Sequence, residues 1–268
     1  RSVKGLTQMV LKKSAALEKM RRGETATAIK INLDGMRGVN QAGLFGFDFI
    51  WLDQEHCPNG ITEIERQFNA AKAGGCDVIV RVKRGSYSDM INFLEMNCEA
   101  IMIPHIKTAA EAAEIVRMTK FHPLGRRPID GGNADGGFTL AEYAEYRRFV
   151  NENRMVIIQI EDVEALDELD AIAATPGIDM LFFGPADFAH SLGAPDDFQH
   201  PRLLEARRLV AAAARRHRKL AGTTGPTARF RDYAAMGYNL ISVGADVVGL
   251  SEYYGRIAAE MAKIGSEK

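Results

Sequence analysis

Five side chains that can take part in catalysis or bind a metal stand at the ends of consecutive apolar segments of the chain. They are His56, Arg81, His105, Glu161 and Asp187. In a barrel of parallel strands, the carboxyl ends of all strands open onto one face, and such barrels place their chemistry there. The sequence therefore predicts that these five side chains meet in a single pocket.

Glu161 and Asp187 are the strongest candidates for a metal site. Each carboxylate follows a segment rich in Val, Ile, Leu, Met and Phe, where an unpaired charge is costly. Two such carboxylates repel each other unless a cation lies between them, and Mg²⁺ binds one or two protein carboxylates and leaves positions for water and substrate. We expect a divalent metal, Mg²⁺ first, with Mn²⁺ or Co²⁺ also suitable. The alternative is that each carboxylate caps a helix or pairs with an arginine.

The segment GPAD, which begins at Gly184, predicts the start of a helix. Helix N-termini expose backbone N–H groups and favour anions. We expect a substrate carboxylate to accept hydrogen bonds from the amides of Ala186 and Asp187. Alternatively, Asp187 serves only as the N-cap of the helix.

Arg81 lies late in an otherwise apolar strand, where a guanidinium needs an anionic partner. Its planar fork suits a substrate carboxylate or keto oxygen. Asp53 lies three residues before His56, and an aspartate that orients a histidine is typical of a general base. Glu55 could compete for the role of base, and His56 could instead be hydrogen-bonded in a loop. His105 is a second imidazole expected at the pocket, with a purely structural role as the alternative.

Short apolar segments alternate with amphipathic helical segments along the chain, a pattern typical of βα units and a parallel sheet. The segments predicted as strands are residues 26–33, 47–55, 77–82, 100–105, 155–161, 178–184, 219–225 and 239–245. Eight such units predict an α/β protein with a (β/α)8 TIM barrel. A doubly wound sheet is the alternative, but the segment DGMRGVN after the first strand has no GxGxxG phosphate loop.

We expect residues 1–268 to form one domain, with an N-terminal helix within residues 1–24 (Gln8–Arg22), the barrel in residues 25–250 and a C-terminal helix in residues 251–268. Two insertions interrupt the alternation, residues 122–154 and residues 188–201. Loops of this length in a compact barrel are usually lids or interface arms.

Composition excludes several classes of partner. Lys and Arg number 34 and Asp and Glu number 35, which leaves no excess positive charge for nucleic acid or an anionic membrane. The apolar segments are too short to span a bilayer, and the N-terminus has no signal-peptide pattern. Three cysteines without CxxC spacing argue against zinc and disulfides. We therefore expect a cytoplasmic protein.

Taken in order, these residues and motifs resemble the HpcH/HpaI aldolases, the metal-dependent class II pyruvate aldolases. The resemblance rests on D-x-E-H-x-P at Asp53–Pro58, the VR of the third strand, PLGRR at Pro123–Arg127, QIE at Gln159–Glu161, GPAD at Gly184–Asp187, SLG and HP within Ser191–Pro201, and VGAD at Val243–Asp246. It covers about residues 25–260. It implies a barrel, a divalent metal on Glu161 and Asp187, and a pyruvate enolate as the shared intermediate. It also implies that Arg81 steadies the enolate oxygen and that His56, oriented by Asp53, is the acid/base.

The chain departs from the family at three places, one of which is LEMNCEA at Leu94–Ala100, where classical aldolases have an LDAGA-like stretch. Ile-Pro-His-Ile, with His105, stands where many members have VPMV, and GRRPIDGGNADGG stands where they have GRRGVG. A histidine after strand four together with Arg81 on strand three is similar to macrophomate synthase, a member of this fold. By that likeness Tyr143 or Tyr146 is a third element, and we expect Tyr146 to bind substrate. Family resemblance also implies a homo-oligomer, a trimer or hexamer, in which the last helix is exchanged between subunits.

The expected activity is that of a carbon–carbon lyase or synthase acting on a 2-keto acid such as pyruvate or oxaloacetate. It would form a pyruvate enolate by decarboxylating oxaloacetate, by (retro-)aldol reaction of a 4-hydroxy-2-keto acid, or by both. The second substrate would be an aldehyde or an unsaturated acceptor. The alternatives are a macrophomate-synthase-like enzyme that joins the enolate to a 2-pyrone and, more remotely, a non-catalytic metabolite-binding barrel.

Overall fold

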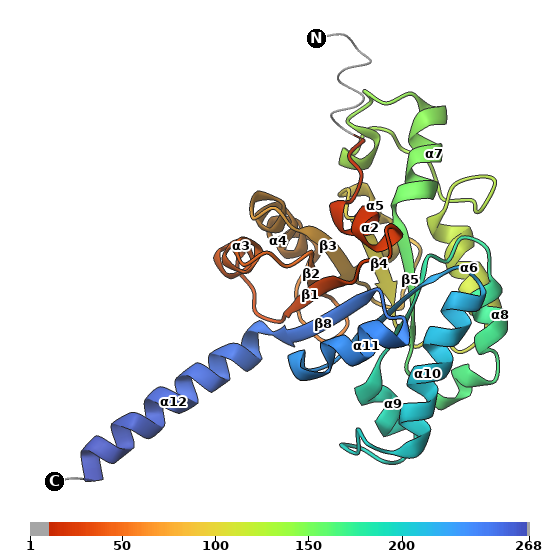
Figure 1. Ribbon diagram of the computed structural model, residues 1–268. Coiled ribbons are helices and arrows are strands. Elements are labelled where there is room, and N and C mark those ends of the chain that lie inside the picture. The colour runs from red at the N-terminus through yellow and green to blue at the C-terminus, as the bar shows by residue number, and fades with distance from the viewer. Residues whose placement is uncertain (1–10, 267–268) are drawn as a thin grey trace.

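The computed structural model, which describes residues 11–266, is a closed barrel of parallel strands surrounded by helices (Figure 1). Each strand pairs with the next in sequence, and β8 pairs with β1 to close the ring. The strands are β1 (Ala26–Ile31), β2 (Phe49–Asp53), β3 (Asp77–Arg81), β4 (Ala100–Ile103), β5 (Met155–Ile160), β6 (Met180–Phe183), β7 (Leu220–Thr224) and β8 (Leu240–Ala245). The (β/α)8 TIM barrel predicted from the sequence is confirmed.

The described chain has eleven α-helices, most of which pack their apolar sides against the outer face of the strands. They are α2 (Ala15–Arg21), α3 (Met36–Leu44), α4 (Ile61–Ala73), α5 (Ser88–Glu95), α6 (Ala109–Thr119), α7 (Tyr143–Asn153), α8 (Leu169–Ala174), α9 (Pro185–Ser191), α10 (Pro201–Arg216), α11 (Phe230–Met236) and α12 (Asp246–Ser266). Short 3₁₀ helices lie at Ala134–Gly136, Val163–Leu166 and Thr227–Arg229. No helix in the described part of the chain has the length and apolar character needed to cross a bilayer.

Strand residues alternate between two apolar regions because successive side chains point to opposite faces. One set fills the barrel interior and includes Phe49, Trp51, Ile79, Met102 and Phe182. The other set forms the layer between strands and helices. This alternation determines which residue at the end of each strand faces the pocket.

Helix α2 closes the amino-terminal end of the barrel. Ser14 caps it by accepting a hydrogen bond from the amide of Leu17, and Leu17 and Met20 pack against the interior residues. The helix was expected to begin at Gln8. Among the described residues it begins at Ala15, and residues 1–10 lie outside the described part of the chain.

The insertion at residues 122–154 lies away from the face formed by the carboxyl ends of the strands. It connects α6 to the amino end of β5, so a barrel places it at the opposite end from the carboxyl ends of the strands, and Figure 1 shows α7 and α9 at opposite ends of the molecule. Within one chain, the insertion therefore cannot serve as the expected lid over the carboxyl ends of the strands. The insertion at residues 188–201 follows β6, contains most of α9, and is on the side of the strands' carboxyl ends.

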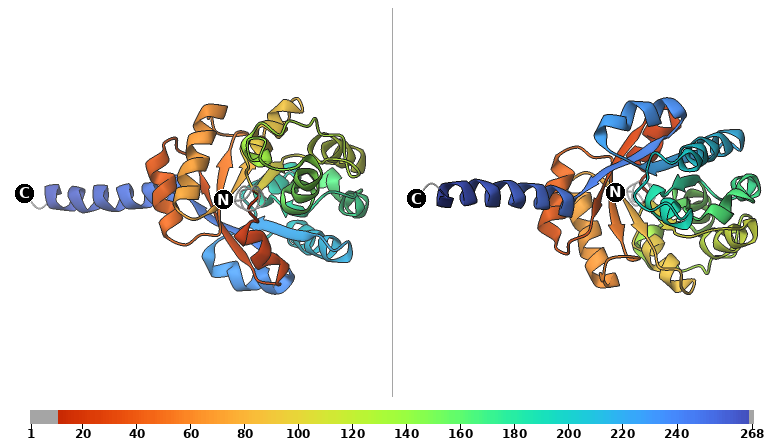
Figure 2. Two further views of the ribbon diagram at one scale, coloured as in Figure 1. Left: turned by 90° about the horizontal axis from the view of Figure 1, so that it is seen from above. Right: turned by 90° about the horizontal axis from the view of Figure 1, so that it is seen from below.

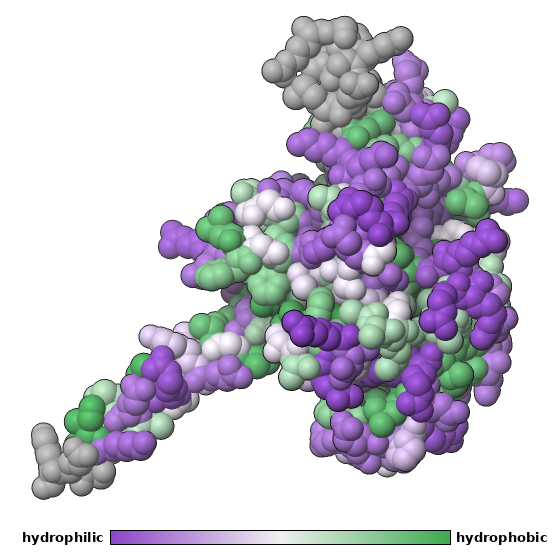
Figure 3. All heavy atoms as spheres, in the orientation of Figure 1, coloured by the Kyte–Doolittle hydropathy of each residue, from purple (hydrophilic) through white to green (hydrophobic). Residues whose placement is uncertain are grey.

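Helix α12 projects from the barrel as an arm (Figure 2). In the space-filling view it stands clear of the body and carries both hydrophobic and hydrophilic residues (Figure 3). Its exposed apolar side chains are Val248, Leu250, Tyr253, Tyr254, Ile257, Met261 and Ile264. The helix begins at Asp246 rather than near residue 251, because Asp246 directly continues β8.

Candidate active site

The interior of the barrel changes from apolar to polar at the carboxyl ends of the strands. On β1, for example, Ala28 is followed two residues later by Lys30, and on β5 Ile157 is followed by Gln159. Residues two apart share a face, so each polar residue continues an apolar interior row. The polar set formed in this way is Lys30, Asp53, Arg81, Gln159, Thr224 and Ser242.

These strand ends surround a pocket of about 560 Å³. Of the residues predicted from the sequence, five line it: His56, Arg81, Gly184, Ala186 and Asp187. The remaining lining residues are Lys30, Trp51, Gln159, Pro185, Thr224, Gly225, Pro226, Ser242, Gly244, Ala245 and Val248. Asp53 and Glu161 are fully buried beneath this surface and contact lining residues.

Arg81 is held by two carboxylates. Its Nε and Nη2 donate to the two oxygens of Asp53 at 2.9 and 2.6 Å, and its Nη1 lies 2.9 Å from Oε2 of Glu55. The guanidinium also lies over the ring of Trp51, 5.1 Å from its centroid. Planar two-point pairing fixes the orientation of the guanidinium as well as its position. Arg81 is therefore a fixed cation that lines the pocket, and the anionic partners that the sequence calls for are Asp53 and Glu55 of the chain itself.

Asp53 does not pair with His56. Its carboxylate is bonded to Arg81, lies 2.8 Å from Nζ of Lys30 and accepts a hydrogen bond from the amide of Glu55. His56 has an exposed side chain, and its Nε2 lies 3.6 Å from Oε2 of Glu55. The expectation that Asp53 orients His56 is corrected, because the buried cations attract this carboxylate more strongly than an exposed imidazole does.

The ionisation of Asp53 follows from the same contacts. Burial acts to raise its pKa, but the hydrogen bonds and charges of Arg81 and Lys30 outweigh burial and lower the pKa to about 2. Asp53 is consequently a permanent anion at neutral pH. It is suited to positioning Arg81 and unsuited to accepting a proton.

Glu161 is a fully buried carboxylate with no lysine or arginine partner among the described residues. It accepts hydrogen bonds from the backbone amide of His105 at 3.0 Å and from the side-chain amide of Gln159. Burial raises its pKa to about 7; His105 opposes this rise, and the charge of Asp187 adds to it. Such a carboxylate is one that a cation would stabilise.

Asp187 completes a set of oxygen donors that suits a divalent cation. It is half-buried and lines the pocket, and its carboxylate makes no hydrogen bond or ion pair with any residue in the range 11–266. Gln159 lines the same pocket, and its buried Oε1 has no hydrogen-bond partner among the described residues. Two carboxylates that pair with no lysine or arginine and an unpartnered carbonyl oxygen fit a hard metal ion such as Mg²⁺. Glu161 and Asp187 are thus the residues that could hold it.

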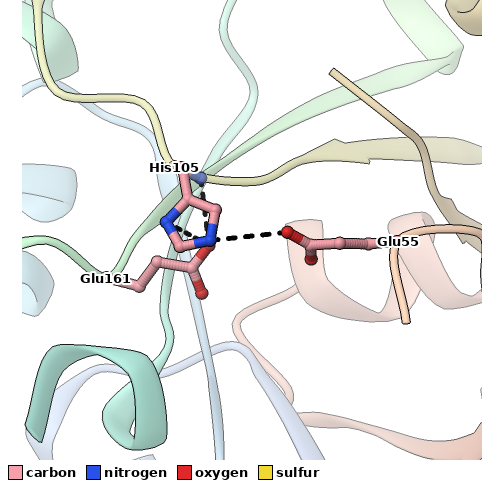
Figure 4. Close-up of side chains that lie close together, drawn as sticks. All are labelled: Glu55, His105 and Glu161. Atoms are coloured by element: carbon pink, nitrogen blue, oxygen red, sulfur yellow. Dashed lines mark hydrogen bonds and ion pairs between the residues drawn. The ribbon is translucent and has the colours of Figure 1, made fainter. Parts of the chain in front are cut away.

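Glu161 also belongs to a second cluster. Glu55, His105 and Glu161 present ligand atoms within 4.8 Å of one another, and Figure 4 shows the imidazole of His105 between the two carboxylates. Nε2 of His105 lies 3.4 Å from Glu55, and Nδ1 lies 3.7 Å from Glu161 and 3.0 Å from Asp162. Glu55 already pairs with Arg81 and His105 with Asp162. Their ligand atoms are therefore less available to a metal than those of Asp187.

The main chain at His105 has a left-handed conformation, with φ of +54°. This conformation is uncommon for residues other than glycine. It directs the amide of His105 to Glu161, and the carbonyl accepts a hydrogen bond from Arg84 at 2.8 Å. His105 thus lies beside Glu161 at the edge of the site.

Helix α9 presents its first turn to the pocket. Gly184 is its N-cap and makes no side-chain cap, so the amides of the first turn lack partners within the helix. Asp187 lies in the first turn and is not the N-cap, which removes that alternative. A Cβ on Gly184 would stand 2.5 Å from Oε2 of Glu161, so any other residue here would require the buried carboxylate to shift.

Tyr146 does not line the pocket, which corrects its expected role in binding substrate. It is fully buried, packs against Phe121 and donates a hydrogen bond to Asp135 at 2.7 Å. Asp135 also accepts a hydrogen bond from Arg127 at 2.7 Å. This cluster anchors the insertion at the amino-terminal side of the barrel. Tyr143, the other tyrosine considered, is on the same helix and is exposed.

Sequence reasoning missed Lys30, Trp51, Gln159, Thr224 and Ser242 as pocket residues. Each stands at an inward position one step above an apolar interior residue, so period-two alternation counted along each predicted strand could have found them. Lys30 in ATAIKINL is the clearest such signal, since a lysine is unusual in a buried strand.

Comparison with known proteins identifies the family. The sequence profile of the HpcH/HpaI aldolase/citrate lyase family matches residues 31–252. The chain belongs to this family. It is 30% identical over 239 residues to 2-keto-3-deoxy-L-rhamnonate aldolase of Escherichia coli K12, which covers 88% of each chain.

Solved structures agree with this assignment. A family member from Burkholderia cenocepacia J2315 superposes with a TM-score of 0.83 at 30% identity, covering 93% of this chain and 99% of that one. Macrophomate synthase superposes with a TM-score of 0.82 at 26% identity, covering 97% of this chain and 94% of that one. The resemblance drawn from the motifs is confirmed, and macrophomate synthase is a structural neighbour.

Proposed function

We propose that this chain is a divalent-metal-dependent carbon–carbon lyase or synthase that forms a pyruvate enolate from a 2-keto acid. The observation that carries the proposal is the placement of Glu161 and Asp187, two carboxylates that pair with no lysine or arginine of the described chain, at the pocket that Arg81 lines. A pocket in which two carboxylates could hold a divalent cation, and which a fixed guanidinium also lines, suits a ligand that has a keto group and a carboxylate.

The chain's residues divide the work as follows. The carboxylate of the 2-keto acid accepts hydrogen bonds from the first-turn amides of α9 at Ala186 and Asp187. Arg81 faces the keto oxygen, where negative charge develops as the enolate forms. A divalent cation on Glu161 and Asp187, Mg²⁺ or alternatively Mn²⁺ or Co²⁺, would act as a Lewis acid on the keto group. Preorganised donors of this kind contribute roughly 3–4 kcal/mol each to the barrier reduction.

Cleavage of a 4-hydroxy-2-keto acid needs a base for the 4-hydroxyl proton, and His56 is the candidate. Its imidazole lines the pocket, and Glu55 rather than Asp53 is the carboxylate near it. Decarboxylation of oxaloacetate needs no base in its first step. Both reactions leave the same enolate, so one site can support either one.

A macrophomate-synthase-like reaction is the second candidate, in which the enolate joins an unsaturated acceptor such as a 2-pyrone. The likeness to macrophomate synthase and the position of His105 beside Glu161 favour it. Tyr146 no longer supports it. Here His105 would donate a hydrogen bond to the carbonyl of the acceptor and make that acceptor more electrophilic.

The proposal is tested by proton NMR of oxaloacetate with metal-stripped protein and again after Mg²⁺ is restored, with the rate for free Mg²⁺ subtracted. We expect pyruvate to appear only with protein and metal together, and Glu161→Gln and Asp187→Asn to abolish the protein-dependent rate. Absence of any such rate would contradict the lyase and favour a non-catalytic metabolite-binding barrel.

The metal ligands are tested separately by titrating Mn²⁺ into the protein by calorimetry. Asp187→Asn should weaken binding strongly, whereas Glu55→Gln should have little effect. The reverse result would assign the metal to Glu55, His105 and Glu161.

We also propose a homo-oligomer, a trimer or hexamer, in which α12 covers a neighbouring subunit. The support is the row of exposed apolar residues on α12 and an apolar groove of about 280 Å³ between β1 and α3, lined by residues such as Ile31, Val39 and Phe45. Light scattering should give the mass of a trimer or hexamer for the wild type. The double substitution Tyr254→Glu and Met261→Glu should reduce it to that of a monomer, and an unchanged mass would refute the exchange.

A further inference from the structure

Arg207 on α10 is a buried cation without an acidic partner. The residue is 4% exposed and forms no ion pair with a carboxylate of the described chain. Its Nε is buried without a hydrogen-bond partner among the described residues, and burial lowers its pKa. A buried charge that lacks a counter-ion costs stability. The rings of Tyr233 and Phe183, with centroids 4.3 and 5.1 Å from Cζ, offset only part of that cost.

The polar contact of Arg207 leads to the end of β6. Its Nη1 donates a hydrogen bond to Oγ1 of Thr223 on β7 at 2.8 Å. That hydroxyl donates to the carbonyl oxygen of Phe183 at 3.1 Å, with the carbonyl oxygen of Thr224 as a second acceptor at 3.3 Å. Phe183 is the last residue of β6 and the register partner of Thr223. One hydroxyl group thus connects the guanidinium to the end of β6.

The residues that contact Arg207 adjoin the pocket, although Arg207 is not among the residues that line it. Phe183 directly precedes Gly184, which lines the pocket and is the N-cap of α9. Tyr233 stands against Gly225, another lining residue, where a Cβ would lie 2.3 Å from the ring. Arg207 therefore supports the pocket wall from behind and can act on a ligand only through these neighbours.

We propose that Arg207 is a positioning residue that holds Gly184, and with it the first turn of α9, in place to bind the carboxylate of the 2-keto acid. The inference rests on the carboxylate-binding part of the proposed function and adds to it a residue outside the pocket that sets the affinity. The carboxylate keeps its charge while the enolate forms, so the amides of α9 bind the ground state and the transition state alike. Loss of Arg207 should therefore raise KM and leave kcat nearly unchanged.

The test compares Arg207→Met with Arg208→Met, which replaces the exposed neighbouring arginine of the same helix. Pyruvate binding to the Mg²⁺-loaded protein is followed by the fluorescence of Trp51, the one tryptophan of the chain and a lining residue of the pocket, so this readout needs no turnover. Arg207→Met should raise the Kd for pyruvate, and the KM for exchange of its methyl hydrogens in D₂O, roughly 3- to 10-fold, the loss expected for about one hydrogen bond. Arg208→Met should match the wild type.

Stability separates positioning from a merely structural role. Replacing a buried charge by an apolar side chain of similar length is often neutral or stabilising. The urea midpoint of Arg207→Met should therefore equal or exceed that of the wild type. Weakened binding together with a lowered midpoint would assign Arg207 to stability alone.

A double-mutant cycle tests the connection through Thr223. Thr223→Val removes the hydroxyl, so this variant and the double variant should both have the Kd of Arg207→Met. Additive effects would refute the connection, and an unchanged Kd in every variant would refute the inference. If Arg207→Met does not fold, an unchanged Kd in Thr223→Val refutes it.

The wild type separates this inference from the proposed function. A wild type that binds pyruvate without exchanging its methyl hydrogens refutes enolate formation alone, and the Kd values still decide the role of Arg207. A wild type that does not bind pyruvate refutes both.

Discussion

Arg81 and Asp53 form a two-point ion pair beneath the pocket, with Nε 2.9 Å from Oδ1 and Nη2 2.6 Å from Oδ2. Both residues are buried, at 3% and 0% exposure. A pair of this geometry fixes the plane of the guanidinium, so Asp53 acts on substrate through Arg81. Because Asp53 pairs with Arg81, His56 lacks the aspartate partner that its position three residues after Asp53 predicts.

The Asp53→Asn variant should lose stability with a defined dependence on pH. Breaking a buried pair costs about 3–5 kcal/mol. The pKa of Asp53 is lowered from 3.8 to about 2 in the folded protein, so its contribution is complete above its ordinary pKa and is lost as the pH falls through about 2. The difference in urea unfolding free energy between wild type and variant should therefore be constant from pH 7 to pH 5. Asp232→Asn, at an exposed ion pair, is the control. A difference that already narrows between pH 7 and pH 5 would refute this ionisation.

Substitution of His56 and substitution of His105 should impair different reactions. His56→Ala should reduce retro-aldol cleavage of a 4-hydroxy-2-keto acid by about 10²–10⁴-fold, the usual contribution of a general base, and spare oxaloacetate decarboxylation. His105→Ala should reduce bond formation with an unsaturated acceptor. Pyruvate release and acceptor consumption measure the two effects. If neither substitution alters either reaction, both assignments are incorrect.

Gly184→Ala should disable the site and leave the barrel folded. The new methyl group would stand 2.5 Å from Oε2 of Glu161 and 3.0 Å from Nε2 of Gln159, so Glu161 must move. A displacement of about 1 Å in a catalytic group can cost 10²-fold in rate. Gly38→Ala is the matched control, because a Cβ there meets nothing within 4 Å. Equal activity in both variants would show that the position of Glu161 is not critical.

Tyr146→Phe should affect stability and leave substrate binding intact. The buried carboxylate of Asp135 would lose one of two hydrogen bonds, at a cost of about 1.5–3 kcal/mol, since hydrogen bonds to charged groups are the stronger ones. Denaturant unfolding measures the loss, and KM for the 2-keto acid should match that of the wild type. A raised KM with unchanged stability would restore Tyr146 to the substrate site.

The barrel was predictable because its pattern is repeated and local. Each apolar strand ends at a residue such as Arg81 or Glu161, and parallel strands bring those ends together regardless of loop detail. The ion-pair partner of each carboxylate was not predictable, because it depends on which cationic side chains the fold brings near that carboxylate. Asp53 is three residues from His56, yet it bonds to Arg81 and Lys30 from the two neighbouring strands. Tyr146 was misplaced because an insertion before β5 lies at the other end of the barrel from the pocket.

The central claim is that this pocket generates a pyruvate enolate, and hydrogen exchange into pyruvate tests it without knowledge of the second substrate. Pyruvate is incubated in D₂O with metal-stripped protein, with protein and Mg²⁺, and with Mg²⁺ alone, and its methyl signal is followed by proton NMR. We predict deuterium incorporation at the methyl carbon with protein and Mg²⁺ together, and its loss in Asp187→Asn. If the methyl signal decays no faster with protein and Mg²⁺ than with Mg²⁺ alone, the result would contradict enolate formation and, with it, the proposed lyase.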